Sequence, residues 1–195
     1  MTKLPAVILG TGPSLEKQRD NLLRWRAENK VRLFGVNNTF NDFPLDVWIA
    51  CDPKWHEHYG QVEGDFDKWH WDKGICEKYG YQHIEGRWGD GLSTDKSYIH
   101  YGHSSGYQAL GLAAHYGHKE VYLAGFDMED AGKRHYFDDL SDDSGEYPEK
   151  LRKYSKFAGL IECYETVWEQ TDRPVIFNMN PFSALRCFPF RYSIE

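Results

Sequence analysis

No stretch of this sequence is apolar for long enough to cross a bilayer, and the amino-terminal MTKLPAVILG is too short an apolar run for a signal peptide. A surplus of positive charge is also missing, because 23 lysines and arginines against 30 aspartates and glutamates give a net charge of -7. That balance argues against a general nucleic-acid surface or an anionic membrane as partner. We therefore expect a cytoplasmic protein that binds a small ligand.

Cysteine is scarce and is not arranged for metal or disulfide chemistry. The four cysteines are far apart and include no CxxC pair, so we expect free thiols in a reducing compartment. Repeats, low-complexity tracts and dividing linkers are absent too. At 195 residues, the chain has an ordinary length for one domain. We expect residues 1–195 to form a single nucleotide-binding domain.

The first motif that is present is AVILGTGPSL, residues 6–15. A short apolar run suited to one buried strand breaks into a glycine turn that leads to a helix. Such a turn points free amide groups at one spot, where an anion is favoured. Two interpretations stay open, a loop that holds the phosphate of a nucleotide and a tight turn whose glycines serve geometry. The loop residues are Gly10, Thr11, Gly12, Pro13 and Ser14.

Several short apolar segments alternate with amphipathic ones along the chain. Apolar runs over residues 31–36, 46–51, 120–124 and 174–178 each end in a small or polar cluster. Helical patterns cover residues 16–30, 107–116 and 149–170. This alternation is typical of an α/β domain with one open, mostly parallel sheet and helices on both faces, a Rossmann-like fold. The ligand crevice is then expected at the carboxyl ends of the strands.

Two regions fit this pattern poorly. Residues 54–102 are rich in tryptophan and histidine, and we interpret them as an irregular, aromatic-rich insertion that packs rather than binds metal. Residues 129–147 are charged and aperiodic, which predicts a mobile loop.

A second motif, HSSGYQALGLAAHYGHKEVYLAGFD, occupies residues 103–127. Ser104 or Ser105 suits a helix N-cap, and Gly106 permits close packing or approach of a ligand. The following strand ends in Gly-Phe-Asp, which places Asp127 at the sheet edge. The start of this helix is a second candidate anion site.

Three stretches taken together resemble one set of families. VILGTGPSL with FGVNN, then SSGYQALGLAAHYGHKEVYLAGFDM, then YSKFAGLIECYETVW followed by FNMNPFSAL are similar, in this order, to motifs of the bacterial sialyltransferases of glycosyltransferase family 42. The wider group related to archaeal hydroxymethylpterin pyrophosphokinases shares the pattern. Residues 54–102 do not take part in the resemblance.

The resemblance implies a nucleotide-sugar donor bound without a required cofactor or metal. It places the Gly10–Ser14 loop under the nucleotide and Asn37 near the donor. The helix start at Ser105 and Gly106 would meet the nucleotide, and Asn180 and Ser183 would lie beside the base.

This chain departs from the sialyltransferases at four positions. Thr11 and Asp52 stand where those enzymes have asparagine, His135 where they have tyrosine, and Tyr154 where they have the catalytic histidine.

The resemblance implies a glycosyltransferase of unknown donor and acceptor, with the oligomeric state left open. We expect His135 to titrate in catalysis, because an ordinary imidazole has a pKa of about 6.5, and Tyr154 to orient or pack. Two alternatives remain. One is a pyrophosphokinase-like enzyme that uses ATP and a Mg²⁺ held by Asp52 and Asp127. The other is a nucleotide-binding protein without catalysis.

Overall fold

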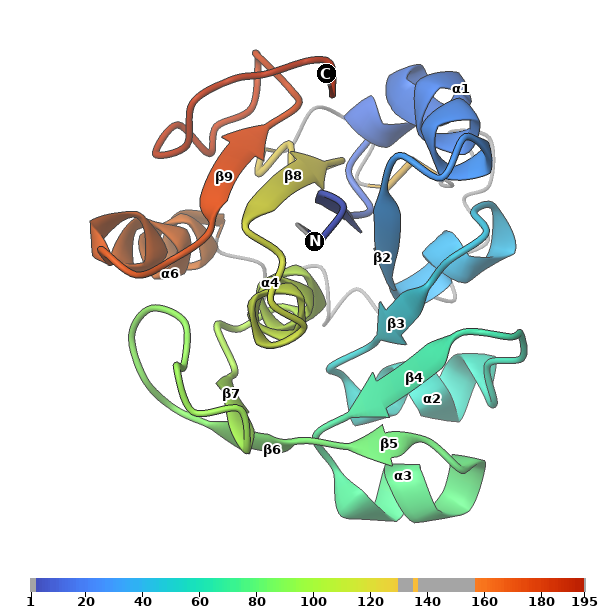
Figure 1. Ribbon diagram of the computed structural model, residues 1–195. Helices are drawn as coiled ribbons and strands as arrows, with labels where there is room; N and C mark the ends of the chain where they lie inside the picture. The colour runs from blue at the N-terminus through green and yellow to red at the C-terminus, as the bar shows by residue number, and fades with distance from the viewer. Residues whose placement is uncertain (1–2, 130–134, 137–156, 195) are drawn as a thin grey trace.

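The computed structural model describes residues 3–129, 135–136 and 157–194. Its centre is a seven-stranded parallel sheet in the order β5-β4-β3-β2-β1-β8-β9 (Figure 1). The predicted open parallel sheet is therefore confirmed. The strands of this sheet are β1 (Ala6–Leu9), β2 (Arg32–Val36), β3 (Val47–Ile49), β4 (Asp67–His70), β5 (Gln82–His83), β8 (Glu120–Ala124) and β9 (Val175–Asn178).

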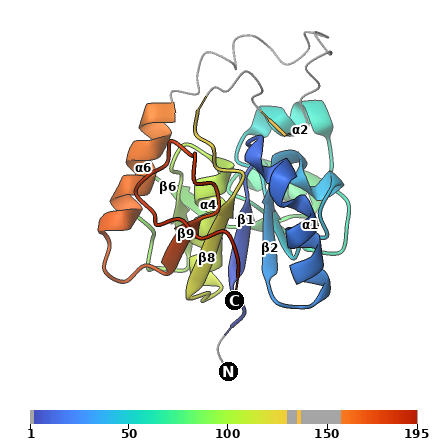
Figure 2. The ribbon, with the colours of Figure 1, turned by 90° about the horizontal axis from the view of Figure 1, so that it is seen from above.

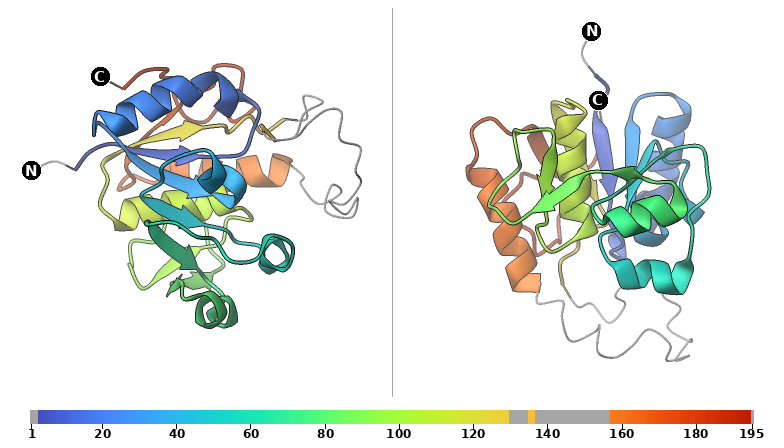
Figure 3. Two further views of the ribbon diagram at one scale, coloured as in Figure 1. Left: turned by 90° about the vertical axis from the view of Figure 1, so that its right-hand side faces the viewer. Right: turned by 90° about the horizontal axis from the view of Figure 1, so that it is seen from below.

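Helices cover both faces of the sheet, as the alternation predicted (Figure 3). Successive side chains of a strand point to opposite faces, so Ala6 and Ile8 of β1 pack in one core and Val7 and Leu9 in the other. The first core contains α4 (Ser105–His115) and α6 (Phe157–Glu169). The second contains α1 (Ser14–Ala27) and residues of α2 (Pro53–Tyr59) and α3 (Lys73–Tyr79).

The chain leaves β1 in one direction and returns on its other side. From β1 it passes through α1 to β2 and onward to β5, and it comes back through α4 to β8, which pairs with the opposite edge of β1. Figure 2 shows β9, β8, β1 and β2 side by side. The strand order reverses between β1 and β8, and ligands of open α/β sheets bind at such a reversal, outside the carboxyl ends of the strands.

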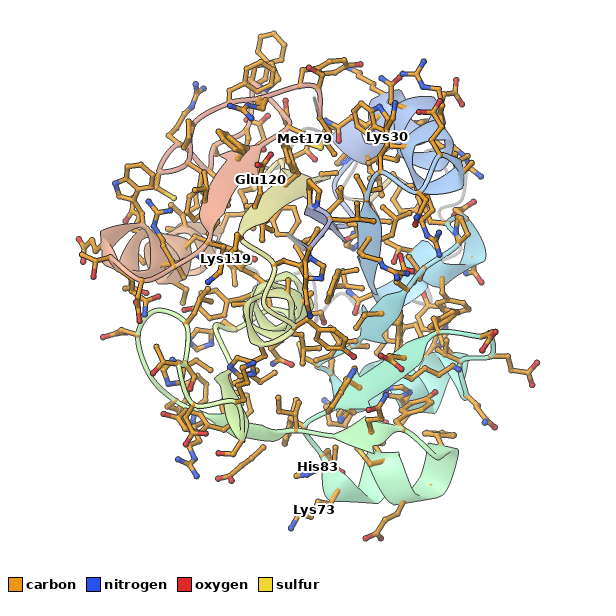
Figure 4. All side chains as sticks on the ribbon, viewed as in Figure 1. Lys30, Lys73, His83, Lys119, Glu120 and Met179 are labelled. Atoms are coloured by element: carbon orange, nitrogen blue, oxygen red, sulfur yellow. The ribbon has the colours of Figure 1, made fainter. Side chains whose placement is uncertain are left out.

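The aromatic-rich segment is not the irregular insertion that the sequence predicted. Residues 54–102 contain α2 and α3, add β4 and β5 to the main sheet, and form a second, two-stranded sheet from β6 (Glu85–Arg87) and β7 (Tyr98–His100). Strands of two to four residues are too short to show a hydrophobic period, which explains the correction. In Figure 4, Met179, the residue after β9, lies beside the end of β8 and near α1, whereas His83 is the last residue of β5, the edge strand on the far side of the sheet.

The histidines of this segment pack among aromatic rings, as expected. His56 and His70 are buried, and their ring centroids lie 5.2 Å apart. Burial lowers the pKa of both imidazoles, that of His70 to about 4, so both are neutral at pH 7. Each ring has an Nε2 atom without a hydrogen-bond partner in the described chain.

Other predictions differ in detail or fall outside the described residues. The helix expected over 16–30 spans Ser14–Ala27, and the strand expected over 46–51 is only Val47–Ile49. Of the expected mobile loop, only Glu129 and the pair 135–136 are described, and Tyr154 is not. All four cysteines are free, as predicted. None of the helices that the structure describes is long and apolar enough to cross a membrane.

Candidate functional site

A cavity of about 180 Å³ opens where the strand order reverses. It lies at the carboxyl ends of β1, β2 and β8 and is closed by the first turn of α4 and by α6. The sequence predicted a crevice at this edge of the sheet. The lining residues are Gly10, Thr11, Gly12, Val36, Asn37, Ser104, Ser105, Gly106, Gly125, Phe126, Asp127, Met128, Glu129, His135, Phe157, Leu160 and Tyr164.

The start of α4 presents hydrogen-bond donors to this cavity. Ser104 is the N-cap, and its Oγ accepts a hydrogen bond from the Tyr107 amide at 3.1 Å. The amides of Ser105 and Gly106 have no acceptor among the described residues. Two free amides at a helix start make a local positive potential that favours an anion.

The side chain of Ser105 fixes this helix start to the neighbouring strand ends. Its hydroxyl donates to Asn37 Oδ1 at 3.1 Å and accepts from the Cys51 amide at 2.9 Å. Asn37, which directly follows β2, has a φ of 47°, a conformation that asparagine tolerates better than most residues. Both residues line or support the cavity as the sequence predicted.

Tyr164 of α6 supplies a buried hydroxyl without a partner. Its side chain is 0% exposed, and its Oη makes no hydrogen bond within the described chain. Burial raises the pKa of Tyr164, and the neighbouring Ser104 hydroxyl offsets part of that rise. The Oη lies close to Gly106, since a Cβ built there would be 3.1 Å from it. An unpaired buried hydroxyl costs about 1–3 kcal/mol, so a ligand polar atom at this position would be stabilising.

The glycine loop at the start of α1 is arranged differently. The Gly10 and Gly12 amides each donate at 2.8 Å, to the carbonyls of Ala124 and Gly125. The Ser14 amide and hydroxyl both donate to the Asp127 carboxylate, the hydroxyl at 2.9 Å. The expected anion position at this helix start is thus filled by the protein's own carboxylate.

The two loop glycines are required by this close packing. A Cβ on Gly12 would lie 2.0 Å from Asp127 Oδ2, and one on Gly10 would lie 2.5 Å from the Gly125 carbonyl. The arrangement favours the geometric interpretation of the glycine turn. Gly10, Thr11 and Gly12 still line the cavity, whereas Pro13 and Ser14 do not.

His135 is held against the glycine loop by Thr11. His135 Nδ1 lies 2.9 Å from Thr11 Oγ1, and the amide of Tyr136 donates to the Thr11 carbonyl at 2.8 Å. The buried Tyr136 also donates its hydroxyl to Asp42 at 2.8 Å. Thr11 therefore fixes two consecutive residues from a distant part of the sequence, and His135 lines the cavity.

Asp52 and Asp127 cap different helices. Asp52 follows β3 and accepts from the Lys54 amide at 2.9 Å, which caps α2. Between β3 and β8 lie three strand spacings, roughly 14 Å at about 4.8 Å each, too far for one Mg²⁺ to contact both carboxylates. Among the described residues, no three histidines, cysteines or acidic residues form a metal-binding group.

Asn180 and Ser183 lie behind the cavity instead of lining it. Asn180 Nδ2 donates to Asp127 Oδ1 at 2.9 Å, and the Ser183 hydroxyl donates to the Phe126 carbonyl. Both are buried. They hold the end of β8 in place, which is a supporting contact to the site and not the expected contact to a base.

Sequence reasoning missed the α6 wall of the cavity. Phe157, Leu160 and Tyr164 repeat at helical spacing, which is typical of a buried helix face, and nothing in the local sequence distinguishes a core tyrosine from one whose hydroxyl meets a cavity. Met128 and Glu129 were missed as well. Met128 has a φ of 55°, a strained conformation that concentrates at functional sites but leaves no sequence signal outside glycine and asparagine.

A scan against protein-family models gives no match, and a search of the curated proteins gives none either.

Proposed function

We propose that this protein is a glycosyltransferase that binds the phosphate of a nucleotide-sugar donor at the start of α4. The observation that carries the proposal is the convergence of the Ser105 and Gly106 amides with the buried hydroxyl of Tyr164, none of which has a hydrogen-bond partner among the described residues. These three hydrogen-bond donors line one cavity, and an oxygen atom of a phosphate group is an acceptor that suits them. The cavity also lies where a Rossmann-like sheet binds nucleotides.

The donors are neutral, which limits the charge that the site can hold. Of the described residues that line the cavity, none is a lysine or arginine, and two, Asp127 and Glu129, are acidic. A phosphate that becomes a leaving group gains negative charge as its bond to the sugar breaks. Fixed amides at a helix start stabilise such charge without reorganisation. They would bind the departing phosphate more strongly than the intact donor.

The size and walls of the cavity suit part of a nucleotide. About 180 Å³ is smaller than the roughly 300–1,000 Å³ of pockets for drug-sized ligands. Phe126, Phe157 and Leu160 give it apolar walls against which a base can pack. We infer that phosphate and base occupy the cavity, while the sugar extends toward the open edge of the sheet.

His135 is suited to proton transfer in this reaction. Its imidazole would take the proton of the acceptor hydroxyl as that oxygen bonds to the anomeric carbon. The bond from carbon to the phosphate oxygen breaks, and its electron pair stays on the phosphate. Thr11 Oγ1 at 2.9 Å from Nδ1 orients the ring for this step, as a second group must orient a general base. Tyr154 remains an orienting residue in this proposal and lies outside the described residues.

One observation favours the pyrophosphokinase-like alternative. Asp127 and Glu129 both line the cavity, and two carboxylates close in sequence can hold a Mg²⁺ that a nucleotide brings with it. Glu129 would take the role that we expected of Asp52. The two enzymes differ in their need for metal, so EDTA separates them.

The test is a thermal-shift panel of CMP, UDP, GDP and ATP, each with Mg²⁺ or EDTA. A nucleotide at about 100 times its Kd adds about 2.7 kcal/mol of stability. The proposal expects at least one nucleotide to stabilise the protein in EDTA. Stabilisation only with Mg²⁺ favours the kinase, and none with any nucleotide contradicts both.

Tyr164→Phe makes the test specific to the site. Because its hydroxyl has no hydrogen-bond partner in the part of the chain that the structure describes, its removal should leave the free protein as stable or more stable. It should weaken nucleotide binding about tenfold, the effect of one lost hydrogen bond of about 1.4 kcal/mol. The matched control is Tyr107→Phe, whose hydroxyl donates to the Gly91 carbonyl at 2.6 Å. That variant should lose stability and keep its affinity.

Release of nucleotide from donor sugars then separates enzyme from binding protein. The expected result is slow hydrolysis by the wild type and a loss of roughly 10²–10⁴-fold in His135→Ala. Binding without any release would support the non-catalytic alternative.

A further inference from the structure

Four aromatic rings gather beside the start of α4, outside the cavity. Trp88 lies 5.0 Å from Tyr101 and 4.9 Å from His103, measured between ring centroids, and Tyr101 lies 5.3 Å from Trp71. We call Trp71, Trp88, Tyr101 and His103 the aromatic platform. Trp88 is 70% exposed, although its ring is supported from two sides. A large aromatic side chain held in place and left open to solvent is suited to binding a ligand.

The two-stranded sheet puts the platform in position. β6 and β7 are parallel, with Arg87 paired to His100, so the next residues, Trp88 and Tyr101, emerge side by side at the carboxyl end. The Tyr101 amide donates to the Arg87 carbonyl at 3.0 Å. His103 has a φ of 54°, which a residue with a side chain rarely adopts. The backbone is thus constrained just where it turns into α4.

The platform is continuous with the cavity. Ser104 follows His103 directly and lines the cavity. On the other side, Trp71 Nε1 donates to the Cys51 carbonyl at 2.8 Å, and the Cys51 amide donates to Ser105 Oγ. The platform therefore extends the site along the same edge of the sheet, from the ends of β1 and β8 to those of β3 and β4.

We propose that the aromatic platform binds a sugar ring of a carbohydrate acceptor. The inference rests on the proposed function, because it assigns the second substrate of that reaction. The face of an aromatic ring carries negative charge density, and the C–H groups along one face of a pyranose carry partial positive charge. The two faces attract each other while the sugar hydroxyls remain free for hydrogen bonds.

The alternative occupant of such a platform is the base of the donor. The cavity already offers apolar walls of its own, with the ring of Phe126 among them. The base of the donor therefore does not need the exposed indole of Trp88, which can bind the sugar ring of the acceptor. Hydroxyl recognition is available from the imidazole of His103, which belongs to the platform.

The test is a titration followed by the ¹H–¹⁵N resonances of the labelled protein. The indole resonance of Trp88 is identified by its loss in Trp88→Phe. The probes are the methyl glycosides of glucose, galactose, N-acetylglucosamine and N-acetylgalactosamine, and separately CMP, UMP, GMP and AMP. We expect at least one glycoside to shift the Trp88 indole resonance and no nucleotide to do so. Trp88→Ala changes an exposed position and should weaken the affinity for that glycoside at least about tenfold. In this variant the affinity is measured from the shift of the Ser104 amide resonance.

Trp168→Ala is the matched control, because Trp168 is also exposed, at 45%, but lies on α6. It should leave glycoside binding unchanged. The proposal is overturned if no glycoside shifts Trp88, if a nucleotide shifts it instead, or if Trp168→Ala weakens binding as much as Trp88→Ala. Failure of the proposed function looks different: no nucleotide would then shift the Gly106 amide, whatever the glycosides do at Trp88.

Discussion

The starts of α1 and α4 were both predicted from the sequence as anion sites, but the structure arranges them differently. Each follows a strand and a turn that contains glycine. At α1 the N-cap residue, Pro13, has no side-chain cap, and the carboxylate of Asp127 takes the place of a ligand. At α4 the helix carries its own cap, Ser104, and the Ser105 and Gly106 amides have no acceptor in the described ranges. A glycine turn before a helix therefore marks an anion position without showing whether the protein fills it.

The largest effect that tests this contrast is expected at Gly12. Gly12→Ala should destabilise the protein by about 3 kcal/mol, because the new Cβ would lie 2.0 Å from Asp127 Oδ2. The measurement is denaturant unfolding. Gly159→Ala in α6 is the control, since nothing lies within 4 Å of its Cβ position, and it should change stability by at most about 1 kcal/mol, toward greater stability. Equal effects of the two substitutions would show that the loop is not tightly packed.

The next effect concerns the carboxylate at the start of α1. Asp127→Asn should destabilise by about 1.5–3 kcal/mol, because the Ser14 donors lose a charged acceptor next to a helix start. Asp52→Asn is the control. Asparagine caps helices as well as aspartate does, so that change should stay within about 0.5 kcal/mol. If Asp127→Asn is neutral, the carboxylate does not take the place of an anion at α1.

A smaller effect is expected at the cap of α4. Ser104→Ala should lose about 1 kcal/mol, and Ser104→Asn should restore most of it, because asparagine can accept the same amide hydrogen bond. The comparison is made by thermal unfolding of both variants. A loss that asparagine does not restore would mean that Ser104 acts through something other than capping.

The smallest effect on stability, and a larger one on activity, is expected at Thr11. Thr11→Val removes the contact to His135 Nδ1 and should destabilise by about 0.5–1 kcal/mol. If Thr11 orients a catalytic histidine, release of nucleotide should fall roughly tenfold to a hundredfold, with a changed pH profile. Thr11→Ser, which keeps the hydroxyl, should behave nearly as the wild type does. If the wild type, Thr11→Val and Thr11→Ser release nucleotide at the same rate, Thr11 has only a structural role.

The sequence by itself determined most of the main sheet and the edge at which the cavity lies. Apolar runs that end in small or polar clusters predicted β1, β2, β3, β8 and β9, because buried parallel strands need continuous apolar segments. The short strands β6 and β7 were not predictable, because EGR and YIH are not continuous apolar runs and three residues show no period. The predicted crevice lies where the strand order reverses, and Asn37, Ser105, Gly106 and His135 reach it.

Only the tertiary structure decided which groups in that crevice are free. Whether the glycine-loop amides are open depends on the end of β8, more than a hundred residues away, whose carbonyls and Asp127 occupy them. Whether Tyr164 is core or site depends on how α6 packs against Gly106. Hydrogen bonding is a pairwise property of groups brought together by folding, and a sequence lists the groups without their partners.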